Sequence, residues 1–147
     1  MLQLKSAGLL ALVAALGALL TCAAEAGASA GTSADFCSVS RSVASQIVSL
    51  TSASGLATSS SSRLKAEFSA ISSAEPQLRS TAPATIKSDV TKILNLVDVI
   101  TTDLKKANWS ITGLIPHEAA LQQQFTRVKP SITKLRSYYR TSCKLRV

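Results

Sequence analysis

The chain has 147 residues and a formal net charge of +8, and 46% of its residues are hydrophobic. The excess of 16 basic over 8 acidic residues favours an anionic partner, although such a charge also serves solubility alone. Aromatic residues make up only 4% of the chain, which argues against recognition of carbohydrate or of nucleic-acid bases by stacking.

Residues 1–30 are predicted to be a secretory signal peptide. Lys5 precedes an uncharged apolar stretch over residues 7–20, and small residues follow that stretch. A permanent membrane helix usually needs about 20 apolar residues, and this stretch is shorter. We therefore expect cleavage after Ala26 or Ala30, and a mature protein of one domain, residues 31–147, that is secreted or held in the cell envelope.

Cys22 gives the N-terminal segment a second interpretation. Leu19-Leu20-Thr21-Cys22 resembles a bacterial lipobox, in which the cysteine is lipidated and becomes the new N-terminus. That motif has Gly, Ala or Ser before the cysteine, and Thr21 departs from it. Cys22 is therefore either removed with the signal peptide or the site of a lipid anchor. In both cases Cys37 and Cys143 remain as a pair, which suits an oxidising compartment.

The first helix is predicted over residues 34–51. Thr32 and Asp35 fit a capping box at its start. Residues 31–34 are expected to be a flexible N-terminus, and the serine-rich segment 52–62 is expected to be a mobile loop. The apolar residues of the helix recur at intervals of three and four positions: Phe36, Val39, Val43, Ile47 and Leu50.

Two further helices are predicted between residues 64 and 106. Pro76 falls inside the apolar stripe of the first of them and is expected to kink or break it. Pro83 is expected to open the second at a first-turn position, and Lys105-Lys106 suits its C-terminus. The stripe of the first is Leu64, Phe68, Ile71, Ala74 and Leu78, and that of the second is Ile86, Val90, Ile93, Val97, Ile100 and Leu104.

The last helical region is predicted after an apolar connection over residues 108–116. The connection contains Trp109 and is expected to fold over one end of the bundle. Pro130 is expected to kink the helical region or to divide it in two. Its apolar stripe is Leu121, Phe125, Val128, Ile132, Leu135 and Tyr139.

These patterns predict an all-α fold, a four-helix up-down-up-down bundle with proline kinks. In that order of helices, the first helix starts at the end of the bundle where the last one finishes. Cys37 lies in the first turn of the first helix, and Cys143 lies just past the last helix. We therefore predict one disulfide that joins the N- and C-terminal helices.

The sequence predicts no catalytic residue, no metal site and no cofactor. His117 is the only histidine, whereas zinc needs three or four ligands and a general base needs a nucleophile and an orienting acid. A surface or capping role is expected for it. Asp89 and Asp98 lie outside the apolar stripe and are expected to be solvated. No paired carboxylates and no phosphate-binding loop can be recognised, so we expect a protein that is not an enzyme.

The basic C-terminal region is the strongest functional signal. Residues 127–147 contain seven cations and no acid, and these cations define a candidate surface for an anionic partner: Arg127, Lys129, Lys134, Arg136, Arg140, Lys144 and Arg146. Helical periodicity places Arg127 and Lys134 on one flank of the apolar stripe. It places the next set on the other flank: Lys129, Arg136 and Arg140. The cations either dock on an anionic membrane or an acidic envelope polymer, or only cover the edge of the core in solvent.

Several features together resemble small bacterial exported helical-bundle proteins with a single disulfide and no agreed function. They are the signal peptide, Phe36-Cys37, the segment Ala82-Pro83-Ala84-Thr85-Ile86, and Tyr138-Tyr139 shortly before Cys143. The resemblance implies a fold and a compartment, and it brings no catalytic residue with it. We expect a binding module without specific nucleic-acid recognition. The alternatives are a carrier of an apolar small molecule in the bundle interior and an inhibitor of an extracellular enzyme.

Overall fold

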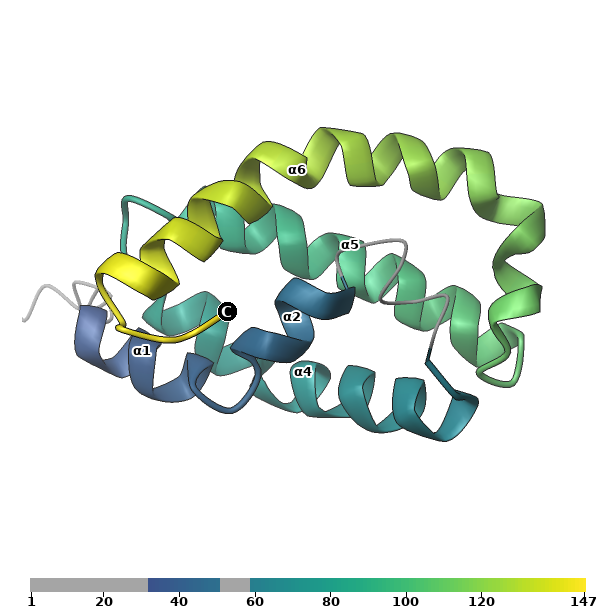
Figure 1. Cartoon of the computed structure of the whole chain (residues 1–147), viewed down its shortest axis with the longest axis horizontal. Helices are drawn as coiled ribbons and strands as arrows, with labels where there is room; N and C mark the ends of the chain where they lie inside the picture. Colours follow the sequence, from purple (N-terminus) through teal and green to yellow (C-terminus); the bar gives the residue numbers. More distant parts are fainter. Residues whose placement is uncertain (1–31, 51–58) are drawn as a thin grey trace, which may run out of the picture.

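The computed structural model describes residues 32–50 and 59–147, which fold as a bundle of α-helices (Figure 1). Within these residues five α-helices and one 3-10 helix (η1) follow one another: α1 (Ser33–Ser40), α2 (Ala44–Leu50), α4 (Ser61–Thr81), α5 (Lys87–Lys106), η1 (Ile111–His117) and α6 (Glu118–Thr141). The all-α prediction is confirmed, but the described part has five α-helices where we predicted four. The predicted signal peptide, Cys22 and residues 52–58 of the predicted loop lie outside the described residues.

A turn at residues 41–43 divides the predicted first helix into α1 and α2. The Val43 N–H donates to the Ser40 carbonyl at 3.0 Å, a bond that spans three residues instead of the four of an α-helix. The Ser42 hydroxyl donates to the Val39 carbonyl at 3.1 Å. Serine side chains compete in this way with helical hydrogen bonds, and this segment is rich in serine.

Hydroxyl side chains set the starts of α1 and α4. The Thr32 hydroxyl accepts from the Asp35 N–H, and the Asp35 carboxylate accepts from the Thr32 N–H, both at 3.2 Å, which is the predicted capping box. Residues 33–34, predicted to be part of a flexible N-terminus, therefore belong to α1. Ser60 caps α4 through the Arg63 N–H at 3.4 Å, so that α4 takes the last two residues of the predicted loop.

The internal prolines do not divide their helices. Pro76 lies inside α4 and Pro130 inside α6, and both helices continue past them. Figure 1 shows α6 bending along its length. Pro83, in contrast, does not open α5. It begins a separate turn in which its carbonyl accepts from the Ile86 N–H at 3.0 Å, and α5 begins only at Lys87.

The connection between α5 and α6 packs closely against the end of α5. The Trp109 N–H donates to the Leu104 carbonyl at 2.7 Å, and the Trp109 ring lies 6.4 Å from that of Phe68. Gly113 is needed here because a Cβ at this position would overlap the Cβ of Ala107. Leu114 of η1 is buried, so the connection extends the core, as its apolar content predicted.

The core lies between all of these helices, and the most regular predicted stripe supplies much of it. In α5 the residues Val90, Ile93, Val97, Ile100 and Leu104 are all buried, as predicted. The α4 helix packs against α1 and α5, and α5 packs against α6. Figure 1 shows α4, α5 and α6 running in alternating directions. This order brings the end of α6 next to α1, where the two predicted cysteines meet.

Candidate functional site

One disulfide and two aromatic contacts fix the end of α6 to α1. The predicted disulfide between Cys37 and Cys143 is present, with its Cα atoms 5.1 Å apart and a sequence separation of 106. Beside it, the fully buried Phe36 ring stacks on Tyr139 at 6.0 Å and meets the edge of Tyr138 at 5.9 Å. The Tyr138 hydroxyl also hydrogen-bonds the Ser33 hydroxyl. The C-terminal segment is therefore held in a defined place.

Tyr139 is a fully buried phenol in this junction. Burial raises its pKa from 10.0 to about 12, and the neighbouring Ser40 hydroxyl opposes the shift. Neither hydroxyl has a hydrogen-bond partner of good geometry among the described residues. Because a buried hydroxyl without such a partner costs free energy, Tyr139 owes its place in the core to its ring.

Tyr139→Phe is expected to change the alkaline stability of the protein. A raised folded-state pKa means that the unfolded chain loses the phenol proton first, so the native protein loses stability as the pH rises from 10 to about 12, a loss that Tyr139→Phe does not share. A shift of this size corresponds to roughly 2–3 kcal/mol in the free energy of unfolding. Urea unfolding between pH 9 and 11.5 should show a steeper loss in the native protein than in Tyr139→Phe. The two proteins differ only in this hydroxyl, so parallel curves would refute the expectation.

The structure divides the seven predicted cations into groups with different surroundings. Lys134 is engaged, since its ammonium lies 2.8 Å from the Asp89 carboxylate. Arg140 donates to the main-chain oxygen of Val147 at 2.7 and 3.1 Å. Arg136 is half-buried, and its Nε has no hydrogen-bond partner among the described residues. The remaining four are exposed: Arg127, Lys129, Lys144 and Arg146.

Asp89 joins α5 to α6, and the expectation that it is solvated is wrong. Its carboxylate accepts from Lys134 and, at 2.8 Å, from the hydroxyl of the buried Ser131. The hydrogen bond from Lys134 lowers the pKa of Asp89, helped by Ser131 and by the nearby charge of Lys92, while partial burial opposes the shift. The antiparallel register of α5 against α6 creates this contact, and no pattern in the sequence predicts that register.

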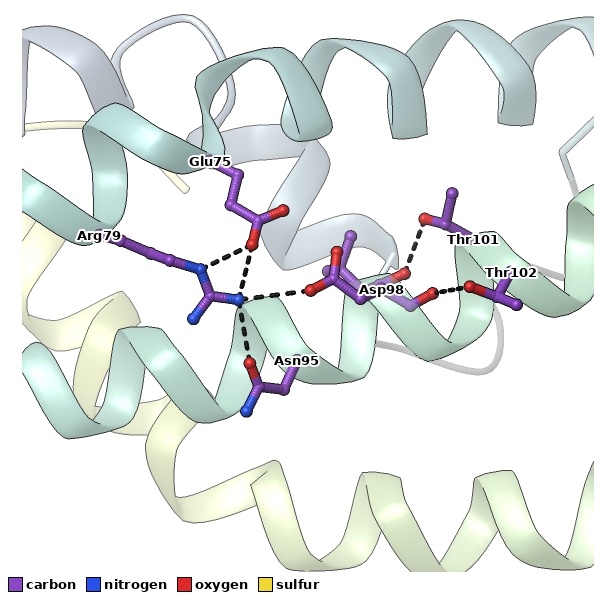
Figure 2. A network of polar contacts seen from close by, with 7 residues as sticks. Glu75, Arg79, Asn95, Asp98, Thr101 and Thr102 are labelled. Atoms are coloured by element: carbon purple, nitrogen blue, oxygen red, sulfur yellow. Dashed lines mark hydrogen bonds and ion pairs between the residues drawn. The ribbon is translucent and has the colours of Figure 1, made fainter.

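A second polar network, between α4 and α5, was also missed (Figure 2). The Arg79 guanidinium donates to Glu75 at 2.6 Å on its own helix and, across to α5, to Asn95 at 2.9 Å and Asp98 at 3.3 Å. Partial burial and the adjacent Glu75 carboxylate raise the pKa of Asp98, and Arg79 opposes the shift. Asp98 is therefore ion-paired, in contrast to the prediction of a simply solvated acid. The Glu75–Arg79 spacing of four residues was the one visible signal.

A shallow groove lies along the seam between α5 and α6. Its volume is about 160 Å³, and its surface is mostly apolar. The α5 helix contributes Lys92, Asn95, Leu96 and Val99, and α6 contributes Gln124, Arg127 and Val128. We call this feature the α5–α6 groove. Of its residues, the sequence singled out Arg127 as part of the basic surface and Val128 as a core position, and it singled out none of the others.

His117 is exposed at the start of α6, and its side chain makes no capping hydrogen bond. In residues 32–50 and 59–147 no three His, Cys, Asp or Glu side chains come together as metal ligands would. The helices described over the same ranges are all too short or too polar to span a membrane.

Comparison of the chain with protein families, with curated proteins and with solved structures gave no match. The resemblance to small bacterial exported single-disulfide proteins therefore stays an expectation. The basis for a functional proposal is the geometry of two surfaces, the basic end of α6 with the segment that follows it and the α5–α6 groove.

Proposed function

We propose that this protein is a non-enzymatic exported helical module that docks on an anionic membrane surface through its C-terminal region. The observation that carries the proposal is the charge of residues 127–147, with seven cations and no acid. Of these cations, Lys134 is the one that makes an ion pair with a carboxylate in the described part of the chain. With no acid in this segment, the charge of the exposed Lys129, Lys144 and Arg146 is available for an anionic partner.

The proposed docking surface is one flank of α6, together with the segment after α6. Helical periodicity places three cations on that flank, and two more follow in the last residues: Lys129, Arg136, Arg140, Lys144 and Arg146. We call this set the basic flank. The disulfide and the Phe36 contacts hold its scaffold against α1. A surface fixed in this way loses little conformational entropy when it binds.

The fold that we propose behind this surface is an up-down-up-down arrangement in which α1 and α2 together take the place of the first helix. The packing of α1 on α4, of α4 on α5 and of α5 on α6 supports it. Export is part of the same proposal, because a disulfide across a separation of 106 residues suits an oxidising compartment. Lipidation of Cys22 would add a hydrocarbon anchor beside the electrostatic one.

Vesicle binding tests the proposal directly. Vesicles with a substantial fraction of anionic lipid should bind the protein, vesicles of neutral lipid should not, and added salt should release it. Each cation near such a surface contributes about 1 kcal/mol, so Lys129→Glu/Arg146→Glu should weaken partitioning by at least about 30-fold.

The matched control is Lys65→Glu/Lys105→Glu, which changes the net charge by the same amount. Both residues are exposed, and they lie at the start of α4 and the end of α5, the end of the bundle away from the C-terminus of α6 (Figure 1). Equal effects of the two double variants would show that net charge alone acts, and would overturn the proposal of a basic flank. Binding to an acidic polymer but not to vesicles would replace the membrane as the partner.

A further inference from the structure

The α5–α6 groove has a charged end and an apolar end. Asp89 of α5 bonds both Ser131 and Lys134 of α6, which fixes the two helices in an antiparallel register. Lys92 is one turn from Asp89 along α5, and Arg127 is one turn from Ser131 along α6, so both cations lie at the same end of the groove. Leu96 and Val99 line it further along α5.

The two cations at this end are available to a ligand. Neither Lys92 nor Arg127 makes an ion pair with an acid of the described chain, and both are exposed. Asp89, one turn from Lys92 on α5, already accepts from Lys134 and Ser131. The Lys134 charge offsets that of Asp89, so this end of the groove carries the positive charge of the other two side chains.

The other end presents hydrocarbon to solvent. Val99 is 39% exposed, although it lies in the middle of a helix whose opposite face forms the core. Leu96 and Val128 form the floor of the groove and are themselves buried. A cavity of about 150 Å³ is enough to hold one benzene ring, so a groove of about 160 Å³ suits a short hydrocarbon chain and not a long one.

From this polarity we infer that the α5–α6 groove binds a free medium-chain fatty acid. The carboxylate lies between Lys92 and Arg127, where a guanidinium and an ammonium offer charge-assisted hydrogen bonds. The hydrocarbon chain covers Leu96 and Val128 and reaches Val99. This site uses the flank of α6 opposite to the basic flank, so membrane docking and fatty-acid binding can each fail without the other.

Titration of the full-length protein with octanoate tests the inference, with amide chemical shifts as the site-specific readout. Octanoate should shift the amides of the residues around the groove and saturate. Acetate, which lacks the chain, and octylamine, which carries the opposite charge, should bind at least about tenfold more weakly. Equal binding of octylamine would show that the cations take no part, and shifts spread over other surfaces would show that the groove is not the site. Either result overturns the inference, as does the absence of any octanoate shift.

Two sets of variants separate the charged end from the apolar end. Lys92→Met/Arg127→Met keeps side-chain bulk but removes both charges, and should weaken octanoate at least about tenfold, as measured by calorimetry. Lys65→Met/Lys105→Met removes two charges from exposed positions elsewhere and should leave the affinity unchanged. Val99→Asp places a carboxylate at the apolar end and should abolish binding.

Thermal unfolding of each variant shows whether it is folded before affinity is compared. All five positions are exposed, so these changes should leave the fold intact. Unaltered octanoate affinity in Lys92→Met/Arg127→Met would refute the placement of the carboxylate. Unaltered affinity in Val99→Asp would refute the placement of the chain.

Discussion

Loss of the Cys37–Cys143 disulfide is expected to lower the free energy of unfolding by about 4–5 kcal/mol. The bond joins residues 106 positions apart, and the chain-entropy treatment gives about 4.7 kcal/mol for a loop of roughly 100 residues. The effect arises in the unfolded chain, because a cross-link over nearly the whole described domain removes many of its conformations. A domain of this size has a total stability of about 5–15 kcal/mol, so the bond accounts for a large share.

Urea unfolding of the oxidised protein and of Cys37→Ser/Cys143→Ser measures this loss. Both cysteines are replaced together because a single replacement leaves a free thiol that can form wrong bonds. Dithiothreitol should destabilise the native protein by a similar amount and should leave the double variant unchanged. A loss of less than about 1 kcal/mol would contradict the expectation and would mean that the unfolded chain is already compact.

The helices and their apolar faces could be predicted because each depends on residues close together in the chain. The capping box of Thr32 and Asp35 involves two residues three apart, and it forms as the sequence indicates. The stripe of α5 depends only on helical periodicity, and its residues from Val90 to Leu104 are buried as predicted. The disulfide could be predicted for a different reason, since the order of helices brings its two ends together.

The turn at residues 41–43 was missed because it leaves the apolar spacing unchanged. Phe36, Val43 and Ile47 are buried before, within and after the turn, at the intervals that one continuous helix would have. The signal lay in the serines, whose hydroxyls weaken helical hydrogen bonding, and not in the hydrophobic pattern. Pro83 was misplaced for a related reason. The rule for a first-turn proline holds for an isolated turn as well as for the start of a helix.

The ion pairs between helices and the α5–α6 groove could not be predicted, because they depend on how the helices are set against each other. Asp89 and Lys134 are 45 residues apart in number, and only the register of α5 against α6 brings their charged atoms within 2.8 Å. The same register divides the predicted basic surface. Lys134 is neutralised and Arg127 joins the groove with Lys92, while the basic flank keeps the other five. Helical periodicity separates Arg127 and Lys134 from the other helical cations, but it does not show that Lys134 meets an acid and that Arg127 lines a groove.

Phe36→Ala is expected to lower the free energy of unfolding by about 3–5 kcal/mol, the second large effect in this protein. Phe36 is fully buried between the rings of Tyr138 and Tyr139, so its removal loses both apolar burial and aromatic contacts and leaves a cavity. Phe36→Leu keeps much of the volume and should cost less. Phe68→Ala, at an equally buried position in α4, provides the reference for a phenylalanine away from the disulfide.

Amide exchange in oxidised and reduced Phe36→Ala tests whether Phe36 helps to hold α1 against the basic end of α6. Phe36 neighbours Cys37, so the ring and the disulfide hold the same helix to the same partner. With the disulfide intact, α1 stays attached after Phe36→Ala, and amide exchange in α1 should rise modestly. In reduced Phe36→Ala both attachments are gone, and α1 should exchange as an open segment while α5 stays protected. Equal protection of α1 in the oxidised and reduced variant would mean that packing on α4 alone holds it, and the junction with α6 would then have no part in presenting the basic flank.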